Sequence, residues 1–147
     1  MSFDHKLIEN VELLTDIFGD FPTFHDAEVV DLTLSSGNYA APVTLEASIH
    51  VFEMTSEVVG NSYVLKHHTL VRFQFDDVLD IKLEDFAHQN VLHDLYFEDI
   101  RHKNLGDIKF EVEFPGVVGL DAKFRCRAIR ILSAEPFTPR GPYAPKG

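Results

Sequence analysis

The sequence predicts an α+β domain in which an N-terminal helix packs on a mainly antiparallel, strand-rich sheet or sandwich. Residues 5–18 carry one apolar stripe at helical spacing, and later segments alternate apolar and polar residues between Gly, Pro and Asn clusters. The length of 147 residues is typical of one domain, and the composition is that of a globular protein. We therefore expect one domain over 1–136 and a Pro- and Gly-rich tail over 137–147 that is extended or disordered.

The predicted helix covers residues 5–18. Its apolar stripe consists of Leu7, Val11, Leu14 and Phe18. Residues at this spacing lie on one face of a helix, so this face should be buried against the sheet. Gly19 suits the end of the helix, and Pro22 then enforces a non-helical connection.

In five later segments apolar and polar residues alternate, which is typical of antiparallel strands that have one face exposed to solvent. They cover about 27–35, 43–54, 63–75, 108–114 and 120–132. In the last segment Ile129 falls out of phase with Cys126, which predicts a β-bulge near Ala128 or a strand covered on both faces. The phase of the strands predicts these core side chains: Phe24, Val30, Leu32, Ile49, Val71, Phe73, Phe110, Val112, Phe124 and Cys126.

The stretch 76–107 is less regular. Leu79, Ile81 and their neighbours favour a short strand. The segment 91–100 fits a strand, but a helix fits its apolar residues nearly as well. Counting these segments, we expect six to eight strands.

The formal net charge is −11, which makes nucleic acid an unsuitable ligand because phosphate binding depends on Lys and Arg. An acidic surface instead favours encounter with a basic protein. The acidic clusters that form the candidate partner-binding surface are Asp76, Asp77, Asp80, Glu84, Asp85, Glu98 and Asp99. Simple solvation of these side chains is the alternative.

The remaining sequence features favour a cytoplasmic protein without a cofactor. No apolar run reaches the roughly 18 residues that a membrane helix needs, and no secretory signal is visible at the N-terminus. The single cysteine, Cys126, has apolar neighbours and is expected to be a core residue rather than a nucleophile. No catalytic constellation stands out, so we expect no enzyme activity.

Eight histidines raise the question of a metal site. His67 and His68 point to opposite faces of a strand and cannot serve one ion, with His67 predicted to point inward. No HExxH motif is present, and we expect no tightly bound metal. The alternative is a metal-dependent hydrolase, whose ligands would be drawn from His25, Asp26, His88 and His93.

Three segments together carry a resemblance to a known family. They are FPTFHDAEVVDLTL at 21–34, LEDFAHQNVLHDL at 83–95 and GLDAKFRCRAIRILSAEP at 119–136. The most specific pieces are the run from Pro22 to Glu28, the pair Gln89-Asn90, and Gly119 followed by Phe124-Arg125-Cys126. In this order, over about 17–136, the chain resembles the immunity protein 50 family of bacterial polymorphic toxin systems. Members usually have Trp before the proline, where this chain has the aromatic Phe21.

The resemblance implies a small cytoplasmic protein that binds and neutralises a cognate toxin domain without turning over a substrate. It carries no catalytic residue over to this chain. A structural or oligomeric module with an unknown ligand is a further alternative, and whether the protein forms a homodimer stays open.

Overall fold

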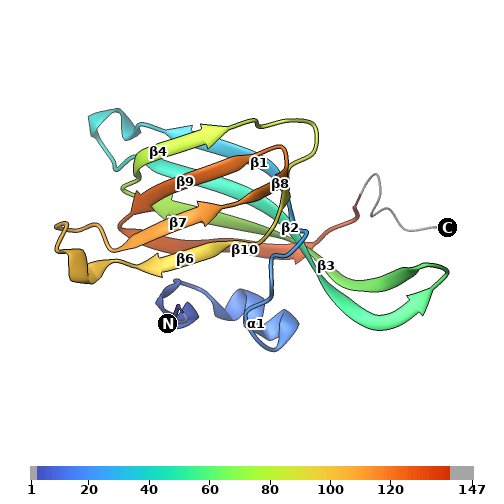
Figure 1. Cartoon of the computed structure of the whole chain (residues 1–147). Coiled ribbons are helices and arrows are strands. Elements are labelled where there is room, and N and C mark those ends of the chain that lie inside the picture. Colours follow the sequence, from blue (N-terminus) through green and yellow to red (C-terminus); the bar gives the residue numbers. More distant parts are fainter. Residues whose placement is uncertain (1–2, 140–147) are drawn as a thin grey trace.

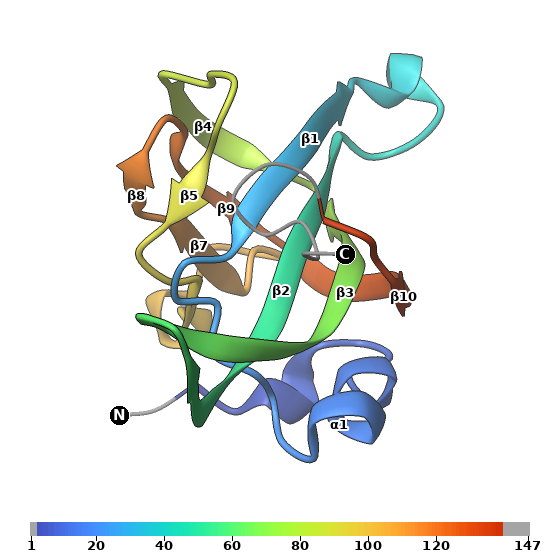
Figure 2. The same cartoon turned by 90° about the vertical axis from the view of Figure 1, so that its right-hand side faces the viewer.

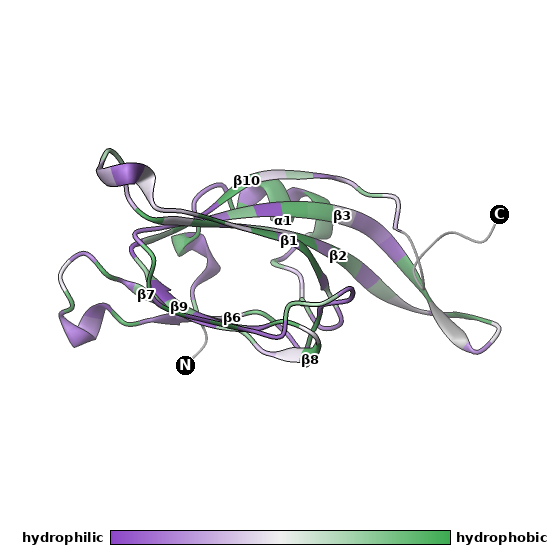
Figure 3. Cartoon of the chain, turned by 90° about the horizontal axis from the view of Figure 1, so that it is seen from above, coloured by the Kyte–Doolittle hydropathy of each residue, from purple (hydrophilic) through white to green (hydrophobic). Residues whose placement is uncertain are grey.

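The structure is a computed structural model that describes residues 3–139, apart from the side chains of residues 62 and 63. It is mostly β, with 56% strand and 12% helix. Two antiparallel sheets face each other, as Figures 1 and 3 show from two directions. The strand-rich, antiparallel prediction is confirmed, whereas the α+β class is confirmed only in part because little of the chain is helical. The described part of the chain has ten strands, more than the six to eight expected.

The larger sheet has six strands. Their order is β10 (Ala128–Pro136), β3 (Ser62–Asp76), β2 (Thr44–Val59), β1 (Glu28–Ser35), β5 (Val91–Leu92) and β8 (Gly116–Val118). The smaller sheet has four strands. Their order is β4 (Leu79–Glu84), β9 (Asp121–Cys126), β7 (Phe110–Phe114) and β6 (Tyr96–Asp99). The hairpin of β2 and β3 extends beyond both sheets (Figure 1).

The N-terminal segment forms two short helices instead of one. They are the 3₁₀ helix η1 (His5–Leu7) and α1 (Glu12–Phe18). Between them Glu9 joins the edge of β10, where its N–H donates to Ile129 O and its C=O accepts from Ile131 N–H, both at 2.9 Å. These bonds hold the backbone extended at Glu9 and so interrupt the predicted helix between η1 and α1. In Figure 2 α1 lies below the strands of the larger sheet.

The core lies between the two sheets. Of the ten predicted core side chains, eight are buried and Leu32 is partly buried against them. The prediction for Val30 is wrong, because 44% of Val30 is exposed and Val29 is buried instead. A β-bulge between Val29 and Asp31 shifts the register of β1 at this point and turns Val30 outward.

The chain passes from one sheet to the other six times, and two of these connections explain irregularities in the sequence pattern. After β9 the Arg127 N–H donates to Asp76 O at 2.8 Å, and the chain continues as β10 in the larger sheet. This change of sheet, rather than a bulge or a doubly covered strand, explains the phase shift near Ala128. The ambiguous segment 91–100 is neither one strand nor a helix, because β5 pairs in the larger sheet and β6 in the smaller one.

The predicted tail follows β10, and its residues 140–147 lie outside the described residues. Its first residue is not detached, since Phe137 N–H donates to His68 O at 3.0 Å. Within the described residues no helix has the length and apolar character needed to cross a membrane.

Candidate functional site

One of the predicted contact residues, Asp76, is buried. Only 3% of it is exposed, and its carboxylate accepts hydrogen bonds from Arg130 and Gln74, each at 2.7 Å. The prediction of Asp76 as a contact residue is therefore wrong. Its neighbour Asp77 is half-buried and pairs with Arg127. Both acids neutralise arginines where the chain enters β10, so they hold the fold together.

Three of the other predicted acids lie exposed on the outer face of the four-stranded sheet, Asp80 and Glu84 from β4 and Glu98 from β6. Asp85 directly follows β4, whereas Asp99 ends β6 opposite Phe110 and is half-buried on the other face. We call this outer face the charged face, and it is formed by Asp80, Lys82, Glu84, Glu98, Glu111, Glu113, Lys123 and Arg125.

The charges on this face are unevenly paired. Glu111 has Arg125 at 3.6 Å and Lys123 at 4.0 Å, both on the neighbouring strand β9, and opposite charges so placed stabilise a sheet. Glu98 stands directly opposite Glu111 in the register, and like charges in this position are destabilising. Among the described residues no ion pair involves Glu98. The acidic side of the face is therefore the side of β6 and β7.

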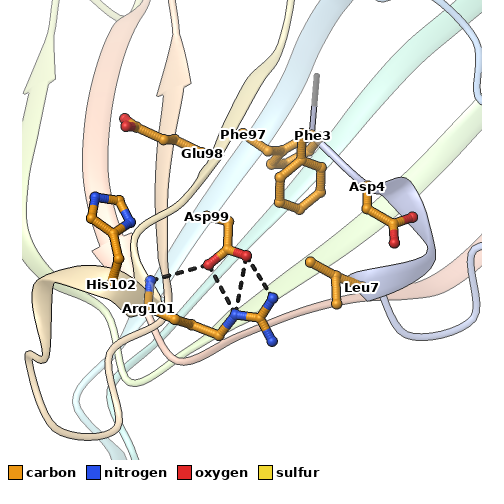
Figure 4. A pocket seen from close by; sticks show the side chains of 8 residues that line it. All are labelled: Phe3, Asp4, Leu7, Phe97, Glu98, Asp99, Arg101 and His102. Carbon is orange, nitrogen blue, oxygen red and sulfur yellow. Dashed lines mark hydrogen bonds and ion pairs between the residues drawn. The ribbon is translucent and has the colours of Figure 1, made fainter. Parts of the chain in front are cut away.

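A hollow of about 640 Å³ adjoins the charged face at β6 (Figure 4). The residues that line it are Phe3, Asp4, Leu7, Phe97, Glu98, Asp99, Arg101 and His102. The Phe3 ring lies 5.4 Å from the Phe97 ring and 5.8 Å from the Phe110 ring, so the N-terminal segment supplies part of an apolar floor. The hollow thus joins two predicted residues, Glu98 and Asp99, to the start of the chain.

Asp99 is tied to Arg101, as the dashed lines in Figure 4 show. The guanidinium donates to both carboxylate oxygens, with the shortest bond 2.6 Å, and the Arg101 N–H donates at 3.0 Å. Hydrogen bonding from Arg101 lowers the pKa of Asp99, so this carboxylate stays charged and its charge is neutralised. The carboxylates of Asp4 and Glu98 then leave the hollow with net negative charge.

Sequence reasoning missed the partners that complete this hollow. Phe3, Asp4 and Leu7 lie about 90 positions before β6 in the chain. Nothing in local periodicity relates an N-terminal segment to a strand at the far edge of another sheet. Only the docking of Phe3 on Phe97 brings them together.

The residues named for a metal-dependent hydrolase are brought together only in part. The His25 ring donates from Nδ1 to the His93 carbonyl at 2.9 Å, and its Nε2 lies 3.6 Å from an Asp26 oxygen. His88 lines a different hollow, together with His50. Within the part of the chain that is described, no three His, Cys, Asp or Glu side chains are grouped so that they could hold a metal ion.

A second histidine cluster lies on the outer face of the six-stranded sheet. His50 Nε2 and His68 Nδ1 are 2.8 Å apart, and the rings of Phe52 and Phe137 surround His50. The prediction that His67 points inward is wrong, because a bulge opposite Glu53 and a φ of +53° turn it to the surface. Burial, together with the charge of His68, lowers the pKa of His50 to about 4.

This depressed pKa predicts that the protein loses stability on acidification. Between pH 6.5 and about 4 the unfolded chain binds a proton at His50 that the folded chain does not bind, so stability rises with pH in this window. The expected loss from pH 7 to pH 4 is up to about 3 kcal/mol, measured by urea unfolding. His50→Gln should flatten this dependence, whereas the exposed control His88→Gln should keep it. An unchanged slope in His50→Gln would refute the assignment.

Cys126 is buried in the four-stranded sheet. Burial, with a further contribution from the Asp76 charge, raises the pKa of its thiol to about 12. The thiol therefore stays protonated at neutral pH, and its expected role as a core residue is confirmed by its complete burial.

The segments that carry the family resemblance meet around β5. The Asn90 side chain accepts from Leu120 N–H at 3.0 Å and from Ala87 N–H at 2.8 Å, and its amide donates to Ala87 O at 2.9 Å. Phe24 N–H donates to Asp94 Oδ1 at 3.1 Å. A side chain at Gly119 would place its Cβ 2.2 Å from Gln89 O, so only glycine fits there. These residues join β1, β5 and the β8–β9 turn.

Taken together, the fold and surface define a mostly β, two-sheet protein that presents a charged sheet face and an adjoining hollow. Comparison with protein-family models, curated proteins and solved structures finds no match to this chain.

Proposed function

We propose that this protein is a non-enzymatic immunity protein that binds and neutralises a cognate bacterial toxin domain in the cytoplasm. The observation that carries the proposal is the resemblance of the three segments to the immunity protein 50 family. Their convergence around Asn90 supports it, because residues scattered over the sequence act as one unit in this fold. Proteins that share this fold would keep the residues that form these contacts.

The charged face supports a protein as the ligand. Its acidic side, along β6 and β7, offers carboxylates that can pair with the basic groups of a toxin and speed up encounter. The adjoining hollow adds apolar surface to these charges, and an apolar centre with a polar rim is typical of protein–protein interfaces. Binding by this face needs no turnover of a substrate.

Co-expression with the toxin encoded beside this protein tests the role. Cells that produce the toxin should survive only when this protein is also present, and the purified pair should form a stoichiometric complex in size-exclusion chromatography with light scattering. Cell death despite an excess of folded protein would remove the proposed role.

Charge reversal tests whether the charged face steers binding of the toxin. Glu84→Lys combined with Glu98→Lys should slow association about tenfold at 0.01 M salt and less at 0.15 M, because the Debye length shrinks from about 30 Å to about 8 Å. The matched control is Glu12→Lys with Asp16→Lys, which changes the net charge equally on the exposed side of α1. Stopped-flow binding measures both. Equal slowing by the two pairs, or a rate independent of salt, would show that the charged face does not steer binding.

A further inference from the structure

We infer that the free edge of β6, with the hollow beside it, receives an extended segment of the protein partner that carries a Lys or Arg side chain. The segment would add a fifth strand to the four-stranded sheet. The inference rests on the proposed function only for the identity of the partner, since the edge and the hollow are features of this chain.

The backbone of β6 has unused hydrogen-bonding groups. Among residues 3–139 it is the last strand of its sheet and pairs only with β7, in the register Asp99↔Phe110 and Glu98↔Glu111. The next residue, Ile100, donates its N–H to Lys109 O at 2.8 Å. Since hydrogen-bonded pairs alternate along an antiparallel ladder, Glu98 bonds to β7, and the N–H and C=O groups of Phe97 and Asp99 point away from it.

The opposite sheet shows how this fold covers an edge. The edge of β10 is joined by Glu9, whose N–H and C=O both bond to β10. At β6 the N-terminal segment contacts the strand through the Phe3 ring, and no described residue forms a bridge to its edge. An uncovered edge strand is a template for an added strand.

The residues around this edge indicate which side chain the added segment carries. The floor formed by Phe3, Leu7 and Phe97 suits the aliphatic stem of a long side chain. Asp4 and Glu98 lie on opposite sides of Phe3 (Figure 4), and each offers a carboxylate to a cationic side chain of the segment, because Arg101 is already engaged by Asp99. A cation beside Glu98 would also relieve its repulsion with Glu111 across the ladder. An acidic segment would meet repulsion at the same place.

A peptide titration of the full chain tests this inference without the toxin. The probe is a blocked hexapeptide of alternating valine and lysine, and the matched probe replaces lysine with glutamate. In ¹⁵N NMR the amides of Phe97 and Asp99 should shift with the lysine peptide and exchange more slowly with solvent, while the glutamate peptide should leave them unchanged. Glu98→Lys should weaken binding at least tenfold. Glu113→Lys, the same reversal on the neighbouring strand, should change it less than threefold.

Three outcomes separate the inference from the proposed function. If the lysine peptide shifts other amides, or if Glu98→Lys leaves its binding unchanged, the inference is wrong. If the toxin is neutralised equally well by the Glu98→Lys variant, the immunity role stands and this edge is not its binding site. If the toxin is not bound but the lysine peptide protects the Phe97 and Asp99 amides, the edge site stands and the proposed function fails.

Discussion

Replacing Phe73 with alanine should lower the free energy of unfolding by about 3–5 kcal/mol, the range for removing a fully buried aromatic side chain. Phe73 has no exposed surface, and its ring lies between those of Phe24 at 5.8 Å and Phe97 at 6.4 Å. These two rings come from the connection before β1 and from β6, so the substitution would empty the space between the sheets. Urea unfolding measured by circular dichroism gives the difference.

The matched control is Val30→Ala, because Val30 was also predicted to be in the core but is turned outward by the bulge. Its effect should stay within about 0.5 kcal/mol, as is usual for surface positions. A loss below about 1 kcal/mol for Phe73→Ala, or equal losses for both variants, would contradict the assignment of the inner face.

Asn90→Ala is expected to cost about 3 kcal/mol, because it leaves several buried or half-buried backbone groups without their partner. The amide side chain bonds the N–H groups of Leu120 and Ala87 and the carbonyl of Ala87. The loss would loosen the junction of β1, β5 and the β8–β9 turn. Thermal unfolding and hydrogen exchange of the Leu120 amide both report on it.

Asn61→Ala is the control for this variant, since Asn61 lies exposed in the turn between β2 and β3. It should leave the thermal midpoint almost unchanged. If Asn90→Ala were equally silent, the residues that carry the family resemblance would not form the structural junction described here. The convergence of the three segments would then no longer support the proposed function.

The sequence by itself determined the strand-rich, antiparallel character of this protein and most of its core. Alternation is a local property of a strand, so the inward phase of Val71, Phe73, Phe110 and Val112 follows from the sequence alone. The prediction failed where the backbone leaves regular geometry, as at the bulge beside Val30. It failed again at Glu9, where an edge strand competes with a helix for the same backbone groups.

Only the tertiary structure decided which sheet each strand joins and which acids reach the surface. Asp76 and Glu98 both belong to acidic clusters in the sequence, yet one is buried against Arg130 and the other stands exposed beside the hollow. Their difference comes from strand order, because β10 supplies the arginine that covers Asp76, and no strand of the described residues lies beyond β6. Strand order depends on contacts between distant segments, and local sequence patterns carry no record of those contacts.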